Sequence, residues 1–428
     1  MSNSISDNIF STTRTHIATL SIKEIASQFS TPTFVYDAEV ILRRVAELSE
    51  FDVVRYAQKA NSNLAILAMM KQQGVVLDAV SAGEIHRALR VGYRGGSDVS
   101  GRHEIVYTAD IFDQDALTLV QEHNIHVNCG SVDMIEQLGK VTPGVEITLR
   151  INPGFGHGHS EKTNTGGSQS KHGIWHEQLE ECKTLAAQYD ITISGLHMHI
   201  GSGCDMEHLS QVCGAMEKAV AVVGDTVRTI STGGGLPIPY SADESHIDLR
   251  EFYALWNATR QRITGQVDHE VCLEIEPGRF LVAESGFLVT QIRSIKTTSD
   301  RRFYLVDAGF NNLARPIMYG AYHPISIAVE EGENHEHVDV VIGGPLCESG
   351  DIFTQQEGGF VCTRSLPEAQ VGDYLVLECA GAYGSVMGSN YNSKLFAAEV
   401  MIHDGAAHLI RVRQTYDALM ADERVMDA

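Results

Sequence analysis

The sequence contains no long apolar run and has few basic residues relative to acidic ones. No window approaches the roughly 18 apolar residues of a membrane-spanning helix, so we expect no membrane partner. The 32 Lys and Arg residues stand against 55 Asp and Glu residues, which gives a formal net charge of −23. This balance argues against a nucleic-acid partner or an anionic-membrane surface, although it allows a local basic pocket for a small anion.

Closely spaced cysteines and an apolar leader are also missing. The eight cysteines are scattered and none forms a C-x-x-C pair, so a zinc ribbon or a thioredoxin motif is not supported and we expect no metal. The first residues are polar and lack the apolar segment of a secretory signal. We therefore expect the chain in the reducing cytoplasm.

What the sequence does contain is a long alternation of strand-like and helix-like segments. The chain has 428 residues, enough for two or three domains or for one large barrel with a second domain. Eight strands with intervening helices are typical of a (β/α)8 TIM-type barrel, an α/β fold. A doubly wound open sheet gives the same alternation, but the count of eight favours the barrel. The strands are expected at 53–59, 75–80, 104–109, 125–129, 145–152, 191–200, 228–233 and 271–276, and the helices at 62–73, 82–91, 113–122, 132–139, 174–188, 206–223 and 247–265.

After residue 285 the pattern changes to short β-like runs separated by turn residues. This predicts a C-terminal all-β domain, a small barrel or a sandwich. An early strand at 32–37 is expected to pair with it, so that the domain also takes in the N-terminal segment. The expected domains are 40–285 for the barrel and 1–39 with 286–428 for the β-rich domain. The runs lie at 287–295, 302–307, 338–342, 374–378, 398–403 and 407–413, with short helices at 22–29, 39–49 and 414–423.

Polar and glycine-rich signals follow the predicted barrel strands. In a barrel, the carboxyl ends of all strands meet at one face, so we expect these residues to form one site. They are Lys59, Asp78, Arg150, the stretch His199-Ile200-Gly201-Ser202, the triple glycine Gly233-Gly234-Gly235, and Glu276-Pro277-Gly278-Arg279.

Lys59 closes the apolar run Val53–Ala57. A buried ammonium is costly unless it is paired or neutralised, and a neutral amine is a nucleophile able to form a Schiff base. The alternative is a lysine whose charged head extends into solvent at the end of the strand.

The triple glycine and Glu276 each allow two interpretations. Gly233, Gly234 and Gly235 let several backbone N–H groups point at one anion such as a phosphate, or they simply form a tight turn. They match neither the Walker loop nor the dinucleotide-binding motif. Glu276 needs a cationic or N–H partner, which a protonated cofactor nitrogen, Arg279, water or a barrel arginine in an internal salt bridge would supply.

His197 and His199 lie two apart on one strand and face the same way. A third metal ligand at recognisable spacing is missing, so His199 better fits a ring stacked on a planar group, with His197 as a core histidine. Cys347 stands beside two acids, which disfavours a thiolate nucleophile and favours a proton donor or a buried thiol. The long glycine-rich loop 154–171 is a mobile lid or a plain surface loop.

Seven motifs in this order resemble the pyridoxal-phosphate decarboxylases of the alanine-racemase fold. The resemblance covers nearly the whole chain. Within this family, the chain is most similar to the branch that acts on diaminopimelate. The motifs are YAQKAN (56–61), HIGS (199–202), GGG (233–235), EPGR (276–279), CESGD (347–351), GAYG (381–384) and YN (391–392), with longer runs such as SKHGIW (170–175) and DAGFNNLARPIMYG (307–320).

The resemblance implies roles for individual residues. Lys59 would form the Schiff base with pyridoxal 5'-phosphate, Glu276 would pair with the pyridine nitrogen, and His199 would stack on the ring. The phosphate would be surrounded by Ser202, Gly234, Gly235, Gly278, Arg279 and Tyr391, and Tyr383 would also bind the cofactor. The substrate would be held by Arg279, Arg315, Tyr319, Tyr383 and Glu348.

The resemblance also implies an assembly and a reaction. Cys347 and Glu348 would reach into the site of a second subunit, so we expect a homodimer with shared active sites. The expected reaction is decarboxylation of meso-2,6-diaminopimelate to L-lysine and CO2, with Cys347 as the proton donor. The alternatives are a related decarboxylase acting on ornithine, arginine, lysine or carboxynorspermidine, a racemase of the same fold, or a non-catalytic pyridoxal-phosphate-binding homologue. The chain departs from the family with Gly388 and with Lys394-Leu395 after Tyr391, where Arg-Pro is common.

Overall fold

The computed structural model of the chain describes residues 10–98, 101–156, 165–199, 201, 206–329 and 336–426. The chain divides into two compact units. The barrel unit comprises Arg43–Pro237 and His246–Leu281, and the β-rich unit comprises Met1–Leu42, Ile238–Ser245 and Val282–Ala428. Each unit is described separately below.

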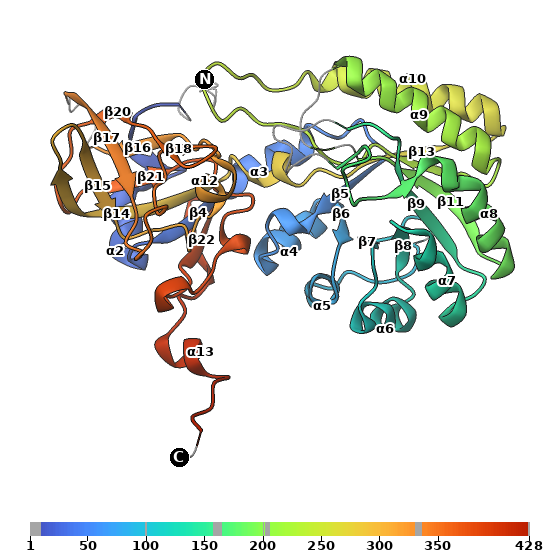
Figure 1. Cartoon of the computed structure of the whole chain (residues 1–428), viewed down its shortest axis with the longest axis horizontal. Coiled ribbons are helices and arrows are strands. Elements are labelled where there is room, and N and C mark those ends of the chain that lie inside the picture. The colour runs from blue at the N-terminus through green and yellow to red at the C-terminus, as the bar shows by residue number, and fades with distance from the viewer. Residues whose placement is uncertain are drawn as a thin grey trace. The chain divides into compact units, whose positions relative to one another are not determined.

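The barrel unit is built on a closed sheet of parallel strands, which confirms the predicted fold class (Figure 1). Pairing of β8 with β9 closes the ring. In ring order the strands are β5 (Val53–Ala57), β6 (Val76–Ala79), β7 (Ile105–Ala109), β8 (His126–Cys129), β9 (Glu146–Asn152), β11 (Thr192–His197), β12 (Thr229–Ser231) and β13 (Cys272–Ile275).

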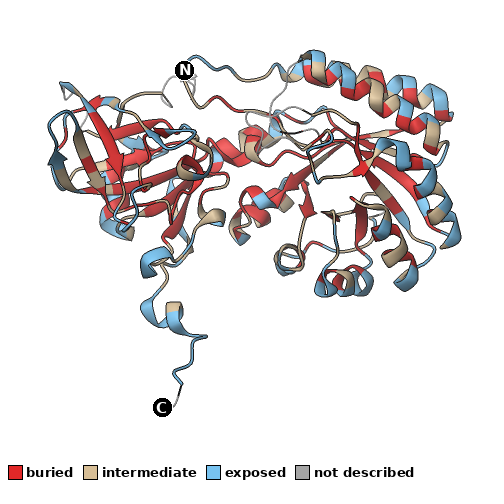
Figure 2. Ribbon diagram, in the orientation of Figure 1, coloured by how far each residue is buried: buried red, intermediate tan, exposed pale blue. Residues whose placement is uncertain are grey.

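Helices follow the barrel strands, and their outer faces are exposed while the strands are buried (Figure 2). Polar side chains begin several of them, because the first N–H groups of a helix need acceptors. Asn63, Ser81, Asp113 and Asp248 each accept a hydrogen bond from the first turn. The helices are α4 (Leu64–Gln72), α5 (Ala82–Arg90), α6 (Gln114–His123), α7 (Val132–Val141), α8 (Leu179–Gln188), α9 (Met206–Val223), α10 (Leu249–Val267) and α11 (Arg279–Val282).

The predicted start of one helix is wrong. We expected a helix from residue 174, but Ile174–Trp175 form strand β10, which pairs with Ile151 and Asn152 at the end of β9. A 3-10 turn (His176–Gln178) then leads into α8. Ile174 is buried in this strand and Trp175 is partly exposed, so the apolar pair reflects strand pairing rather than a helix.

The β-rich unit contains one ten-stranded mixed sheet. Strand β4 (Thr33–Asp37) pairs with β14 and with β22, which confirms that the early strand joins the C-terminal strands. The other strands are β1 (Thr13–Arg14), β14 (Gly286–Thr297), β15 (Arg302–Val306), β16 (Ile325–Ala328), β17 (His337–Gly343), β20 (Arg364–Pro367), β21 (Tyr374–Leu377), β22 (Ala398–His403) and β23 (Ala406–Arg411).

Smaller elements complete the β-rich unit. Helix α2 packs Ile22 and Ile25 onto Val35 and Val376 in an apolar core of the sheet. The remaining elements are β2 (His16–Ile17), β3 (Leu20–Ser21), α2 (Ile22–Phe29), α3 (Ala38–Ala46), α12 (Arg315–Tyr319), β18 (Gln355–Gln356), β19 (Phe360–Val361) and α13 (Tyr416–Met420). Residues 238–245 belong to this unit, although the sequence pattern placed them in the barrel.

Candidate active site

Lys59 lies in a 3-10 turn (Gln58–Ala60) directly after β5, at the carboxyl end of the barrel. Its side chain is 45% exposed, and its Nζ lies 3.6 Å from Oδ2 of Asp78 at the end of β6. Of the two interpretations of the sequence, the buried amine does not describe this side chain, which is partly exposed and paired. The amine is instead held by a carboxylate at the barrel mouth, with room for a ligand to reach it.

Asp78 and Glu84 surround Lys59 with carboxylates that resist ionisation. Burial raises the pKa of Asp78, although Lys59 opposes the shift, and no hydrogen-bond partner for its Oδ1 lies in the described part of the chain. Burial also raises the pKa of Glu84 to about 7, and Asp78 adds to the shift. Both groups therefore take up protons more readily than ordinary carboxylates.

Glu276 follows β13 and is buried, with 8% of its surface exposed. Ser231 donates a hydrogen bond of 2.8 Å to its Oε1, and Nε2 of His197 lies 2.9 Å from its Oε2. Burial alone would raise the pKa of Glu276, but His197, Arg55 and Ser231 hold it well below its usual range. Glu276 is therefore ionised, and it places a negative charge at the carboxyl end of the barrel strands.

The alternative of an internal salt bridge applies to the neighbouring glutamate rather than to Glu276. Arg55, only 1% exposed on β5, donates two hydrogen bonds to Glu274, of 3.0 Å to Oε1 and 3.2 Å to Oε2. From the sequence, Arg55 was predicted only to be part of an apolar strand. Because Arg55 pairs with Glu274, the side chains in contact with the Glu276 carboxylate are His197 and Ser231.

His199 follows β11, and its ring is neutral. Burial lowers its pKa well below the ordinary value, and the charges of Arg150 and Lys59 add to the shift. Its Nδ1 is buried without a hydrogen-bond partner among the described residues. A neutral ring with an unsatisfied nitrogen at this position suits contact with a planar polar group.

The triple glycine forms a cradle that side chains would fill. A Cβ on Gly234 would lie 2.4 Å from the carbonyl oxygen of Glu276, and one on Gly235 would lie 2.2 Å from that of Gly201. Gly235 also has a φ of +94°, which disfavours any L side chain. Gly278 is similarly tight, with a Cβ at 3.1 Å from the carbonyl oxygen of Ala57. This geometry leaves bare backbone for an anion such as a phosphate.

Parts of the predicted site lie outside the described residues. Ser202 is one of them, and so are residues 157–164 of the glycine-rich loop 154–171, for which the sequence allows a lid or a plain surface loop. The base of that loop is fixed, because Asn152 Oδ1 accepts hydrogen bonds from the backbone N–H groups of Gly154 and Gly167.

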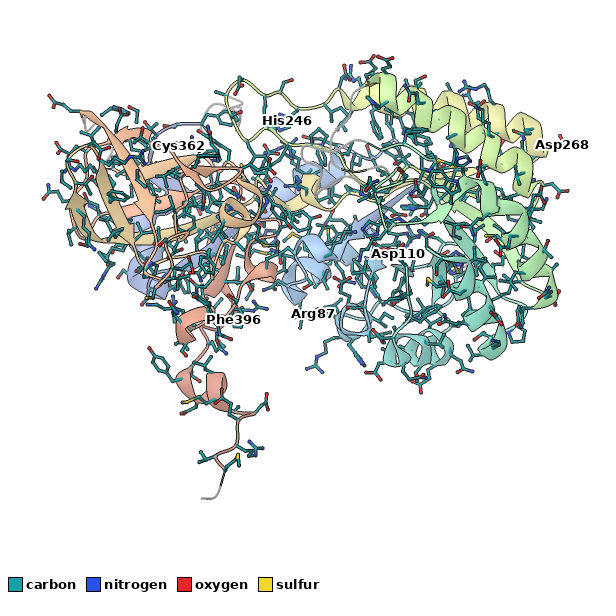
Figure 3. The ribbon with its side chains drawn as sticks, in the orientation of Figure 1. Arg87, Asp110, His246, Asp268, Cys362 and Phe396 are labelled. Atoms are coloured by element: carbon teal, nitrogen blue, oxygen red, sulfur yellow. The ribbon has the colours of Figure 1, made fainter. Side chains whose placement is uncertain are left out.

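A second polar group at the barrel mouth was not singled out from the sequence. Asp110, labelled in Figure 3, follows β7 and accepts hydrogen bonds from Nδ1 of His172 at 2.6 Å and from the N–H of Gly173 at 3.0 Å. Burial would raise the pKa of Asp110, but these two bonds keep it below its ordinary value. Its charge in turn opposes the lowering that burial causes in the pKa of Arg150 on β9.

The β-rich unit carries the predicted substrate arginine. Arg315 is the first residue of α12 and is buried, with 8% exposed. Its Nη1 donates to Nε2 of His323 at 2.9 Å, and its Cζ lies 4.8 Å from the ring centroid of Tyr240. Tyr319 ends the same short helix and is partly exposed.

The predicted cysteine loop lies on the surface of the same unit. Asp351 fixes it by accepting backbone hydrogen bonds of 2.8 Å from Phe310 and from Leu346. Cys347 and Glu348 are consequently exposed on a fixed turn. The thiol of Cys347 is thus not buried, contrary to one of the two readings of the sequence.

Two predicted tyrosines accompany this loop. The ring of Tyr391 is 42% exposed and lies 5.3 Å from that of Phe310. Its neighbour Asn392 accepts a hydrogen bond of 2.6 Å from the N–H of Cys347. Tyr383 is partly exposed and has a φ of +55°, a strained backbone that points to a fixed functional position.

The predicted residues therefore form two groups. Lys59, His199, Gly234, Gly235 and Glu276 come together at the carboxyl ends of the barrel strands, as predicted. The same unit contains Gly278 and Arg279, whereas Arg315, Tyr319, Cys347, Glu348, Tyr383 and Tyr391 belong to the β-rich unit.

Comparisons with known proteins identify the family of the chain. Residues 39–283 match the family model described as the pyridoxal binding domain of pyridoxal-dependent decarboxylases. The chain is 53% identical over 419 residues to the diaminopimelate decarboxylase of Escherichia coli (strain K12), covering 97% of this chain and 99% of that protein.

Solved structures give the same result. A crystal structure of diaminopimelate decarboxylase superposes with a TM-score of 0.89 at 53% identity, covering 93% of this chain and 94% of that one. A diaminopimelate decarboxylase from M. jannaschii, solved in complex with L-lysine, has a TM-score of 0.83 at 28% identity, with 95% of both chains covered.

These findings place the chain in a class and then in a family. It belongs to the pyridoxal-dependent decarboxylases, whose cofactor is pyridoxal 5'-phosphate. Within that class it belongs to the diaminopimelate decarboxylase family. The described residues fit the cofactor, because they supply an accessible lysine, an ionised carboxylate, an unsatisfied histidine nitrogen and a glycine cradle.

Proposed function

We propose that this chain removes one carboxylate of meso-2,6-diaminopimelate to give L-lysine and CO2, the last step of lysine biosynthesis. One observation carries the proposal: the barrel gathers Lys59, the ionised Glu276 and the bare backbone of Gly234 and Gly235 at one end of the sheet. When bound, pyridoxal phosphate supplies the electron-withdrawing ring that accepts the electrons left by the departing carboxylate.

The barrel residues act on the cofactor. Lys59 would supply the amine for the aldehyde group, and Asp78, whose Oδ2 lies 3.6 Å from Nζ, would take the proton that leaves this amine a nucleophile. Glu276 would keep a proton at the ring nitrogen, since its own carboxylate stays ionised beside His197 and Ser231. His199 would contact the ring, and Gly234, Gly235, Gly278, Arg279 and Tyr391 would hold the phosphate.

The β-rich unit recognises the far end of the substrate. Diaminopimelate carries a second ammonium and a second carboxylate, which ornithine and other simple diamine precursors lack as a pair. Arg315 binds that carboxylate through its planar fork, with Tyr319 and Arg279, and Glu348 binds the ammonium. This selects diaminopimelate over the substrates of related decarboxylases.

A second copy of the chain completes each site. Cys347 and Glu348 are exposed on a turn that Asp351 holds rigid, which suits residues that serve a partner subunit. In the homodimer, Cys347 of one subunit donates a proton to the substrate carbon that has lost its carboxylate in the other subunit.

The seven cysteines among the described residues are all unpaired, which supports the expected cytoplasmic location. No helix in the described part of the chain is long and apolar enough to cross a membrane.

Product analysis tests the proposal directly. The holoenzyme is incubated in parallel with meso-2,6-diaminopimelate, ornithine and arginine, and the amino acids and diamines formed are separated and identified. We expect L-lysine from diaminopimelate and at most trace diamines from the others. A preference for ornithine or arginine would assign the chain to a sister decarboxylase, and no product from any substrate would indicate a non-catalytic homologue.

A further inference from the structure

The guanidinium of Arg315 is fixed in two directions by residues that carry no role in the reaction proposed above. Nη1 donates to Nε2 of His323 at 2.9 Å, and Cζ lies over the ring of Tyr240, 4.8 Å from its centroid. The ring of Tyr240 in turn meets that of His323 edge-on, with 5.5 Å between centroids. The hydrogen bond and the contact with the ring both restrict the orientation of the planar guanidinium.

The hydrogen bonds of His323 determine its tautomer. A guanidinium can only donate, so Nε2 of His323 must be the acceptor and carry no proton. Its Nδ1 lies 2.9 Å from the carbonyl oxygen of Glu378, which can only accept, so Nδ1 carries the proton. His323 is therefore neutral, with a single direction of donation, and only 2% of its surface is exposed.

The backbone around His323 is held rigidly. The N–H of Glu378 donates to the carbonyl of Pro324 at 2.9 Å, and this backbone bond extends the pairing of β16 with β21 by one step. The carboxylate of Glu378 is held by Arg14, at 2.7 and 2.8 Å, and by Ser326 at 2.7 Å. The carbonyl that accepts from His323 therefore belongs to a residue fixed by both its backbone and its side chain.

The sequence brings His323 back to Arg315 through a tight turn. Helix α12 ends at Gly320, which has a φ of +60°, and a Cβ there would lie 2.0 Å from the N atom of Glu357. Only glycine fits this reversal, which places residue 323 beside residue 315.

We propose that His323, as its Nδ1–H tautomer and together with the ring of Tyr240, is a positioning residue that sets the direction in which Arg315 presents its guanidinium to the far carboxylate of the substrate. The inference rests on the proposed function, because it assumes that Arg315 binds that carboxylate. His323 thereby contributes to selectivity for a dicarboxylic amino acid without touching it.

Two ligands that differ by a single carboxylate isolate this role. Decarboxylation at one end of diaminopimelate leaves L-lysine with the far carboxylate intact, whereas 1,5-diaminopentane has the same two amines and no carboxylate. Inhibition constants of both are measured with holoenzyme, together with kcat and KM for meso-diaminopimelate. His323→Phe keeps the ring but removes the acceptor, and His323→Gln places an acceptor oxygen near the position of Nε2.

We expect His323→Phe to weaken L-lysine binding and raise KM about tenfold, with kcat within about twofold and 1,5-diaminopentane unaffected. His323→Gln should restore most of the loss, and His323→Asn, whose amide is too short, should not. Cofactor absorbance and thermal melting check that each variant is folded and loaded. If His323→Phe does not fold, the contrast between Gln and Asn decides the question.

Arg315→Ala separates the inference from its premise. If this variant binds L-lysine and 1,5-diaminopentane with unchanged relative affinity, the carboxylate clamp of the proposed function is wrong. If Arg315→Ala selectively weakens L-lysine binding while His323→Phe does not, only the positioning role of His323 is overturned. The same holds if His323→Gln and His323→Asn bind L-lysine equally well.

Discussion

At the scale of single residues, the structure shows that Glu276 is ionised, and we assign its charge to the cofactor nitrogen. Glu276→Gln keeps the shape of the side chain and its contact with Ser231 but removes the charge that, in our proposal, keeps a proton at that nitrogen. We expect kcat for diaminopimelate to fall by about 10²-fold or more, as for other losses of one electrostatic contact.

The control for this prediction is cofactor occupancy, measured from the visible absorbance of the loaded enzyme. Occupancy should remain near that of the unaltered protein, because the phosphate cradle is untouched. A Glu276→Gln variant with full occupancy and a kcat within twofold of normal would show that the ionised carboxylate is not needed.

Single residues also show where sequence reasoning succeeds and where it stops. Lys59, His199 and Glu276 could be placed at one face because each follows a predicted strand, and strand ends in a barrel converge. The partners of these residues could not be predicted, because side-chain pairing across strands depends on register. Alternation along β13 put Glu274 and Glu276 on one side, yet only the structure assigns Arg55 to the first and His197 to the second.

At the scale of elements, the glycine turn that follows β12 has no room for side chains. Gly235→Ala would bring a Cβ to 2.2 Å from the carbonyl of Gly201 at a φ of +94°. We expect affinity for pyridoxal phosphate to fall at least about tenfold, measured by titrating apoenzyme with the cofactor and following absorbance. An unchanged affinity would mean that the glycines serve the turn alone.

Gly214→Ala provides the matched control for that substitution. Gly214 lies within α9, and a Cβ there would meet no atom within 4 Å. This variant should bind the cofactor normally and gain up to about 1 kcal/mol of stability from the higher helix propensity of alanine.

Glu84, in the first turn of α5, lowers the stability of the folded chain by an amount that depends on pH. The pKa of Glu84 is about 7 in the folded chain against an ordinary value of 4.5, so ionising it opposes folding. The cost is absent below pH 4.5, grows as pH rises through this window and is complete above about 7. Glu84→Gln should therefore be more stable than the unaltered protein at pH 8, by on the order of 3 kcal/mol, and nearly equally stable near pH 4.5.

Thermal or urea denaturation of both proteins across that pH range measures the difference. The amide oxygen of the substituted glutamine can still accept the hydrogen bond that Glu84 accepts from the N–H of Val80, so the helix start is preserved. A stability difference that does not change with pH would contradict the raised pKa of Glu84.

Element boundaries were predictable where burial and propensity agree. The eight barrel strands lie within the expected ranges, because parallel strands covered on both faces are continuous apolar runs. The start of α8 was not, since Ile174 and Trp175 satisfy helical and strand patterns equally and their pairing with β9 is a tertiary contact. Residues 238–245 likewise carry no local signal that they belong to the β-rich unit.

At the scale of the whole molecule, the proposal predicts that two inactive proteins restore each other. Lys59→Ala and Cys347→Ala remove residues that we assign to opposite subunits of one site. Random exchange of subunits at equal concentrations gives half mixed dimers, each with one complete site, so about a quarter of normal activity should return.

The measurement is activity after the two variants are mixed under conditions that permit subunit exchange. Each variant mixed with itself is the control. Recovery no greater than in these controls, with mixed dimers shown to be present, would contradict shared sites.

The central claim is that Lys59, although half exposed and paired with Asp78, is the residue that holds the cofactor. Borohydride reduction of the holoenzyme followed by peptide mass mapping tests this most directly. We predict that the visible absorbance band disappears on reduction, that the reduced pyridoxyl group is found on the peptide containing Lys59, and that Lys59→Ala carries no label. A label on another lysine, or persistent labelling and turnover in Lys59→Ala, would contradict the account.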